Sequence, residues 1–122
     1  SHMKKNNVKK CLVLLTMALL VLLSACSNSD KRTLETFTNA FTDAGVVMEG
    51  EGDLLYQMVG AQNGTLFYNG SKVVKIYEYE DEKALQEAVK EYTMMADWPQ
   101  NGKFILETSD EQAIEIFMAV AK

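Results

Sequence analysis

Three carboxylates alternate with glycine in the segment from Glu49 to Asp53, which reads Glu-Gly-Glu-Gly-Asp. Carboxylate oxygens on a flexible loop are ligands that Ca²⁺ takes in proteins. The segment does not match an EF-hand loop, because the further oxygen ligands and the closing bidentate glutamate are missing. We therefore interpret it as a solvated acidic loop and assign no metal and no cofactor to the chain.

A second group of acidic residues, Glu78, Glu80, Asp81 and Glu82, lies at the start of a predicted helix. Acidic side chains are expected there, because they stabilise the positive end of the helix dipole. With 17 acidic residues in the chain, some pair will always lie at a separation suited to glycoside cleavage, so such a pair carries little information. A small carboxylate- or metal-dependent hydrolase is the alternative function.

The residues that nucleophilic catalysis needs are missing after Cys26. That part of the sequence contains no other cysteine, no histidine, and neither a Gly-x-Ser-x-Gly nor a Ser-x-x-Lys motif. Its glycines are not spaced as in a phosphate-binding loop. We therefore predict no catalytic residue and expect a protein that is not an enzyme.

Aromatic residues gather around a predicted hairpin and after the helix that follows it. Tyr68, Tyr77 and Tyr79 lie in the hairpin, and Trp98 follows the helix. If the tyrosines lie on a helix-free face of the sheet, they form an exposed patch that binds a protein or glycan partner, because aromatic side chains are favoured in recognition surfaces. Packing of the same strand residues into a core is the other interpretation.

The first 26 residues have the layout of an export signal. A lysine-rich start precedes an apolar run over residues 12–23, and the run closes with Leu-Ser-Ala-Cys at 23–26. As a helix the run spans roughly 18 Å, which is too short for a bilayer core of about 30 Å. Ser1 and His2 precede Met3 and are typical of residues left by cloning, so we exclude them.

The four residues at 23–26 resemble the lipobox of bacterial lipoproteins. The resemblance implies that signal peptidase II cleaves between Ala25 and Cys26, and that a diacylglyceryl group on the Cys26 sulfur anchors the protein, since two acyl chains make a stable anchor. We predict a signal peptide over residues 3–25 and a location at the extracytoplasmic face of the cell membrane. An ordinary secretory signal with an incidental cysteine is the alternative.

Cleavage at this point leaves a strongly acidic product. All 17 acidic residues but only eight of the 12 basic ones lie after Cys26, so the product carries a net charge of −9. Such a surface repels phosphate backbones and anionic lipid head groups. We therefore predict no nucleic-acid partner and no flat electrostatic contact with a membrane.

Two segments follow the predicted cleavage site. Residues 26–32 form a tether, of which the polar stretch 27–32 reaches only ~20 Å when extended, and residues 33–122 form a single globular domain. Apolar spacing, caps and glycines predict the elements of this domain. In its first half we expect a helix from 33 (or 30) to 44, a short strand at 46–48, a brief helix at 53–59 and hairpin strands at 65–68 and 72–79. In its second half we expect a helix at 81–95, a strand at 103–108, and a last helix to 121 that opens with a capping box at 109–112.

The order α-(short α)-β-β-α-β-α lacks the strict alternation of a doubly wound sheet. We predict an α+β two-layer sandwich, with a small, mainly antiparallel sheet of three to four strands and helices on one face. This layout resembles small lipoproteins of Firmicutes in which a lipobox precedes a compact domain. The matching stretches are Gly64 to Tyr79 and Trp98 to Thr108, and the resemblance implies no particular activity.

The sequence favours a membrane-anchored envelope lipoprotein that acts as a non-catalytic binding module. Its expected contacts are the membrane, through the lipid on Cys26, and a protein or cell-wall partner. The hydrolase described above and a mainly structural role are the alternatives. A deep cleft with two converging carboxylates would favour the enzyme, and a shallow apolar or aromatic surface would favour binding.

Overall fold

The computed structural model describes residues 30–122. The predicted signal peptide, its cleavage site and Cys26 therefore lie outside the described residues. In the described part the helices are α2 (Leu34–Asp43), α3 (Glu82–Glu91) and α4 (Glu111–Ala119), the 3₁₀ turns are η1 (Tyr56–Val59) and η2 (Thr93–Met95), and the strands are β1 (Glu49–Gly52), β2 (Asn63–Asn69), β3 (Lys72–Glu78), β4 (Gln100–Asn101) and β5 (Phe104–Thr108).

The strands form one antiparallel sheet in the order β1-β2-β3-β5-β4. This confirms the α+β class and the antiparallel pairing. The predicted count of three to four strands is too low, because residues 30–122 contain five. The two additional strands, β1 and β4, lie at the two edges of the sheet.

The hairpin of β2 and β3 occupies the middle of the sheet. Asn69 pairs with Lys72, and Gly70 lies between them with a φ of 64°, a conformation that glycine adopts without steric cost. The other side of β3 pairs with β5. The turn signal in the sequence therefore predicted this hairpin correctly.

Neither edge strand follows from a strand-like residue pattern. β1 has no apolar residue, and β4 is only two residues long. The strand predicted at 46–48 is wrong: Val46 is buried against the core outside any strand, and pairing with β2 begins at Glu49. The position of a paired neighbour, rather than β propensity, decides where this strand lies.

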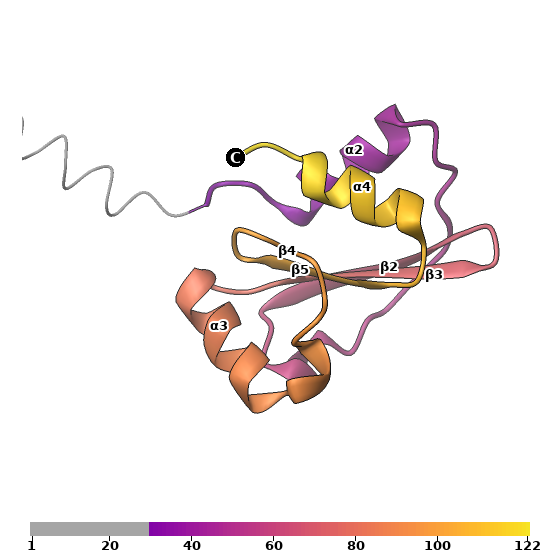
Figure 1. Cartoon of the computed structure of the whole chain (residues 1–122). Coiled ribbons are helices and arrows are strands. Elements are labelled where there is room, and N and C mark those ends of the chain that lie inside the picture. Colours follow the sequence, from indigo (N-terminus) through magenta and orange to yellow (C-terminus); the bar gives the residue numbers. More distant parts are fainter. Residues whose placement is uncertain (1–29) are drawn as a thin grey trace, which may run out of the picture.

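One face of the sheet is covered by α2 and α4 (Figure 1). Its core contains Phe37 and Phe41 of α2, Phe67 of β2, Phe104 of β5 and Phe117 of α4, all of them fully buried. The ring centroids of Phe37 and Phe104 are 4.4 Å apart, and those of Phe41 and Phe67 are 5.1 Å apart. We call this side of the sheet the phenylalanine face.

The opposite face carries α3, η1 and η2 (Figure 1). Here Tyr77 and Tyr79 pack with Leu85 and Ala88 of α3 and with Ile105 of β5. Helices therefore lie on both faces, and the predicted two-layer sandwich with helices on one face is wrong. The reason lies in β3, which carries two apolar or aromatic side chains on each side, Val74 and Ile76 on one and Val73 and Tyr77 on the other, so that neither side is wholly polar. We call this side the tyrosine face.

Side-chain caps set the starts of the two later helices. Asp81 accepts a hydrogen bond from the backbone N of Ala84 at 2.7 Å, so α3 begins directly after it. Asp110 caps α4 by accepting from the backbone N of Gln112 at 3.1 Å. The capping box predicted at 109–112 is therefore wrong in its first residue, because the cap is one position later.

Two predicted helices are shorter in the structure. The brief helix expected over 53–59 is present only as the turn η1, which ends at Gly60 with a φ of 74°. The helix expected to reach 95 ends at Glu91 and is followed by η2. Helix ends fray and tighten into 3₁₀ turns, so apolar spacing alone overestimates their length.

Candidate functional site

Tyr77 and Tyr79 lie on the tyrosine face under the helical cover and do not form a surface. Only 5% of Tyr77 and 1% of Tyr79 is exposed. The exposed patch of Tyr68, Tyr77 and Tyr79 predicted on a helix-free face is therefore wrong, because α3, η1 and η2 pack over this part of the sheet. Among the four aromatic residues predicted to bind a partner, Tyr68 is exposed and Trp98 is half-buried.

Tyr79 has a structural role. Its hydroxyl donates a hydrogen bond to the carbonyl oxygen of Val59, in η1, at 2.6 Å. Burial raises the pKa of Tyr79 to about 12, and the neighbouring Tyr92 adds to the rise. The hydroxyl therefore stays protonated and ties the end of β3 to η1.

Tyr77 and Trp98 pack against each other where the cover of α3, η1 and η2 ends. Their rings stack with centroids 5.9 Å apart and 17° between the planes. The Tyr77 hydroxyl donates to Oε1 of Glu107 at 2.9 Å. Burial, followed by the hydrogen bond to Glu107 and its charge, raises the pKa of Tyr77. The pair is therefore packed and hydrogen-bonded, and only Trp98 keeps partial exposure.

The part of the tyrosine face that α3, η1 and η2 do not cover is accessible to solvent. Side chains that share this face alternate with core residues along the strands, and each of them is exposed or half-buried. We call this set the open sheet surface; it consists of Leu66, Tyr68, Val73, Lys75 and Glu107. The Lys75 amine lies 3.8 Å from Oε1 of Glu107. The period-two alternation of β3 places Val73 and Lys75 on the face of Tyr77, as the sequence pattern predicts.

Tyr68 is the aromatic residue of the open sheet surface, and 41% of it is exposed. Its ring lies close to Gly50 of the edge strand β1: a Cβ added at Gly50 would be 3.0 Å from Cδ2 of Tyr68. Gly50 also has a φ of 64°, so glycine is required there for two reasons. One side of the Tyr68 ring therefore supports β1, and the rest faces solvent.

The acidic segment from Glu49 to Asp53 is not a loop but the edge strand β1 and the residue after it, and every residue in it is exposed. In residues 30–122, no group of three or more histidine, cysteine, aspartate or glutamate side chains lies close enough to hold a metal ion. In the second acidic group, Glu78 pairs with Lys103 at 2.9 Å, and Asp81 caps α3. These two carboxylates therefore have structural partners.

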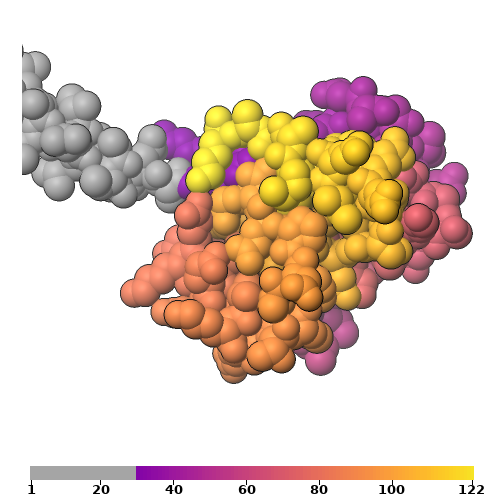
Figure 2. Space-filling view, viewed as in Figure 1, coloured from indigo at the N-terminus to yellow at the C-terminus, as the bar shows by residue number. Residues whose placement is uncertain are grey.

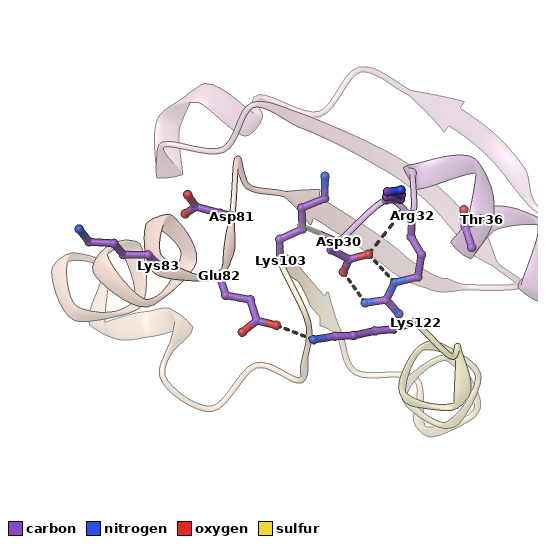
Figure 3. A pocket seen from close by; sticks show the side chains of 9 residues that line it. Asp30, Arg32, Thr36, Asp81, Glu82, Lys83, Lys103 and Lys122 are labelled. Carbon is purple, nitrogen blue, oxygen red and sulfur yellow. Dashed lines mark hydrogen bonds and ion pairs between the residues drawn. The ribbon is translucent and has the colours of Figure 1, made fainter. Parts of the chain in front are cut away.

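A hollow of about 860 Å³ lies where the described chain begins (Figure 3). In Figure 2 the indigo start of the described chain and the yellow C-terminal segment meet at this end of the molecule. The hollow is lined by Asp30, Lys31, Arg32, Thr36, Asp81, Glu82, Lys83, Lys103 and Lys122. The sequence pattern did not single it out, because these residues come from four separate parts of the chain.

The buried Arg32 organises one wall of the hollow. Its Nε and Nη2 donate to the Asp30 carboxylate at 2.8 and 2.5 Å, and its Nη1 donates to Oδ1 of Asn101 at 3.0 Å and to the carbonyl oxygen of Val120 at 3.1 Å. The guanidinium also lies 5.1 Å from the ring centroid of Phe37. Asp30, Arg32 and Asn101 thus tie the start of the described chain to β4 and to the segment after α4, and we call these three residues the tether clamp.

Gly102 and the charge state of Asp30 complete the tether clamp. Gly102 has a φ of 63°, and a Cβ there would collide with the Asp30 carboxylate and lie 2.6 Å from Nη2 of Arg32. The hydrogen bond from Arg32 outweighs burial and holds the pKa of Asp30 below its usual range. The Asp30 carboxylate is therefore ionised at neutral pH, and its bond to Arg32 holds residue 30 against the domain.

The chain matches no protein-family model, no curated protein and no solved structure. None of the helices in the part that the structure describes is long and apolar enough to cross a membrane. What this protein does must therefore be inferred from its own residues: the Leu-Ser-Ala-Cys motif, the open sheet surface and the hollow.

Proposed function

We propose that the protein is a lipoprotein of the bacterial cell envelope, anchored through a diacylglyceryl group on Cys26 at the extracytoplasmic face of the cell membrane. We further propose that its globular domain is a non-catalytic binding module. The lysine-rich start, the short apolar run and the Leu-Ser-Ala-Cys motif support the anchor. The tether clamp supports a domain held close to it, because the chain from Cys26 to Asp30 spans at most about 14 Å.

The open sheet surface is the observation that carries the binding proposal. It combines an exposed aromatic ring (Tyr68) with two half-buried aliphatic side chains (Leu66 and Val73) and a half-buried pair of opposite charges, on one strand pair and its neighbour. Recognition surfaces in proteins commonly join an aromatic anchor to a polar rim. The partner is a protein or a cell-wall component that reaches the domain near the membrane. Trp98 lies beside this surface through its stacking on Tyr77.

A photoreactive amino acid at position 68, in the full chain expressed in its native cell, tests this surface. Position 118 is the matched control, because Met118 is 50% exposed against 41% for Tyr68 but lies on α4, over the opposite face. We expect a discrete crosslinked adduct from position 68 and none from position 118. Equal adducts from both positions, or none from position 68, would contradict the binding proposal.

Metabolic labelling with an alkyne fatty acid tests the anchor. The Cys26→Ser variant should lose the label and leave the membrane fraction, because the acceptor sulfur is gone. The Cys11→Ser variant is the matched control and should keep the label, since that cysteine lies in the segment that is removed. Label that persists in Cys26→Ser would refute the lipoprotein assignment.

A further inference from the structure

Positive charge is concentrated at one end of an acidic domain. Residues 30–122 contain all 17 acidic residues of the chain and eight basic ones. Five of those eight basic residues line the hollow together with only three acidic ones: Lys31, Arg32, Lys83, Lys103 and Lys122 against Asp30, Asp81 and Glu82. The hollow therefore carries a net positive charge on a body whose net charge is −9.

The acidic residues of the hollow already have partners. Asp30 is paired with Arg32 in the tether clamp, and Oε1 of Glu82 lies 2.7 Å from the amine of Lys122 (Figure 3). Asp81 accepts the capping hydrogen bond of α3. Asp30 and Glu82 are thus neutralised by Arg32 and Lys122, whereas Asp81 has a hydrogen-bond partner but no ion pair.

Two lysines of the hollow are not neutralised in this way. Lys103 is paired with Glu78, but among the described residues neither Lys31 nor Lys83 takes part in an ion pair. Both are exposed. Lys31 follows Asp30 in the chain, and Lys83 lies in the first turn of α3, so the two lysines reach the hollow from two separate segments of the chain.

The position of the hollow relative to the proposed anchor gives these lysines a neighbour, and this step rests on the proposed function. The tether clamp holds Asp30 against the domain, so only the chain before it separates the hollow from the lipid on Cys26. That chain spans at most about 14 Å. This end of the domain is therefore the end held nearest to the lipid head groups, and the acidic majority of the surface is on the remaining body.

We propose that the hollow is a docking surface for anionic phospholipid head groups of the membrane that holds the anchor. Lys31 and Lys83 contact the lipid phosphates, and Lys122, which is paired with Glu82, lies in the same hollow and is covered when the domain docks. Basic side chains at an anionic bilayer surface gain favourable electrostatic energy, whereas the acidic body is repelled from the same surface. The docked domain then stands with the hollow toward the bilayer and the rest of its surface toward the envelope. The net charge of −9 does not indicate this contact, because it sums over the whole domain and not over the residues that line the hollow.

Amine footprinting of the lipidated protein, as purified from cells after cleavage of the signal peptide, tests the docking. The protein is reconstituted into vesicles of phosphatidylcholine alone or of phosphatidylcholine with phosphatidylglycerol, treated with a membrane-impermeant acetylating reagent, and analysed by mass spectrometry. We expect Lys31 and Lys83 to react several-fold more slowly in the anionic vesicles, with the difference reduced by salt. The internal controls are Lys72 and Lys90, which are exposed outside the hollow and should react equally in both.

A pair of charge variants sharpens the test. In Lys31→Glu/Lys83→Glu the protection of Lys122 by anionic vesicles should be lost, whereas in Lys72→Glu/Lys90→Glu it should be kept. All four positions are exposed, so neither variant is expected to disturb folding. Equal protection of Lys122 in both variants would overturn the docking surface.

Two further arms separate the sources of failure. Flotation of the same vesicles reports the anchor: protein that floats with both vesicle types but shows no selective protection of Lys31 and Lys83 overturns the docking and leaves the lipoprotein proposal standing. Native protein that does not float overturns the anchor and, with it, the docking. Protection by inorganic phosphate added to phosphatidylcholine vesicles would show a free-anion site and would also overturn docking to lipid.

Discussion

The two faces of the sheet differ in the aromatic residue that covers them. All five phenylalanines of the chain lie in the core under α2 and α4. All five tyrosines lie on the opposite face, together with the single tryptophan; they are Tyr56, Tyr68, Tyr77, Tyr79 and Tyr92. Tyrosine differs from phenylalanine by one hydroxyl, and the two residue types lie on opposite faces of this sheet.

A buried hydroxyl needs a hydrogen-bond partner, so tyrosine suits a layer in which polar groups or solvent are within reach. Tyr79 reaches a backbone carbonyl, Tyr77 reaches a carboxylate, and Tyr68 reaches solvent. The phenylalanine face is filled by rings that are fully buried. Both faces bury a core, but only the tyrosine face leaves part of the sheet accessible, and this is where we propose recognition.

The largest expected effect is on the phenylalanine face. Phe37→Ala should lower the free energy of unfolding by about 3–5 kcal/mol, because it empties a closed site between Phe104 and Phe117. Tyr68→Ala is the counterpart and should cost about 1 kcal/mol, since much of its ring is in solvent. Urea denaturation of both variants measures the difference. Equal losses would break the comparison between the two faces.

A hydroxyl introduced on the phenylalanine face should lower the free energy of unfolding by less than the removal of a whole ring, but by a measurable amount. Phe67→Tyr places a hydroxyl among fully buried rings, with an expected loss of about 1–3 kcal/mol. Its neighbour on β2 points to the opposite face, and Tyr68→Phe should change the free energy of unfolding by no more than about 0.5 kcal/mol. Denaturation of this matched pair decides; if Phe67→Tyr is neutral, the phenylalanine face is not sealed.

Removal of a partnered hydroxyl should have a smaller effect. Tyr79→Phe deletes the hydrogen bond to the Val59 carbonyl and should cost about 0.5–1.5 kcal/mol. The ring itself stays in place, so the circular dichroism spectrum should not change. A stabilised variant would mean that the hydrogen bond does not support η1.

The remaining effect is on the pH dependence of stability, and near neutral pH it is absent. Burial raises the pKa of Tyr79 to about 12 and raises that of Tyr77 as well, so the unfolded chain loses these protons first, from about pH 10. The contribution of these residues to stability is therefore complete below pH 10 and declines as the pH rises toward 12. Urea denaturation across this range should show a shallower decline for Tyr79→Phe than for the parent chain. Parallel declines would show that Tyr79 does not contribute.

Local signals predicted the elements that are fixed by their own residues. The hairpin at Asn69-Gly70, the helix after Asp81, the strand that includes Phe104 and the last helix all appear where turn residues, caps and apolar spacing placed them. The edge strand from Glu49 to Gly52 did not follow, because its pairing depends on β2 and not on its own composition.

The candidate sites were harder to predict than the elements. Apolar and aromatic residues on both sides of β3 are compatible with a bare face or with a second helical layer, and only the position of α3 decides between them. The same ambiguity left open whether Tyr77 and Tyr79 are accessible or packed into a core. The hollow was invisible in the sequence, because Lys31, Lys83 and Lys122 are far apart along the chain.

The sequence by itself determined the quantities that add up along a chain: the acidic total, the absence of histidine and of further cysteine after Cys26, the Leu-Ser-Ala-Cys motif and the local turns and caps. The tertiary structure decided the quantities that depend on neighbours, namely which aromatic rings are covered, which strands pair at the edges and where the lysines gather. The physical reason is that composition and short-range conformation are properties of single residues and their next few neighbours. Burial and electrostatic segregation arise only when distant segments are packed against one another.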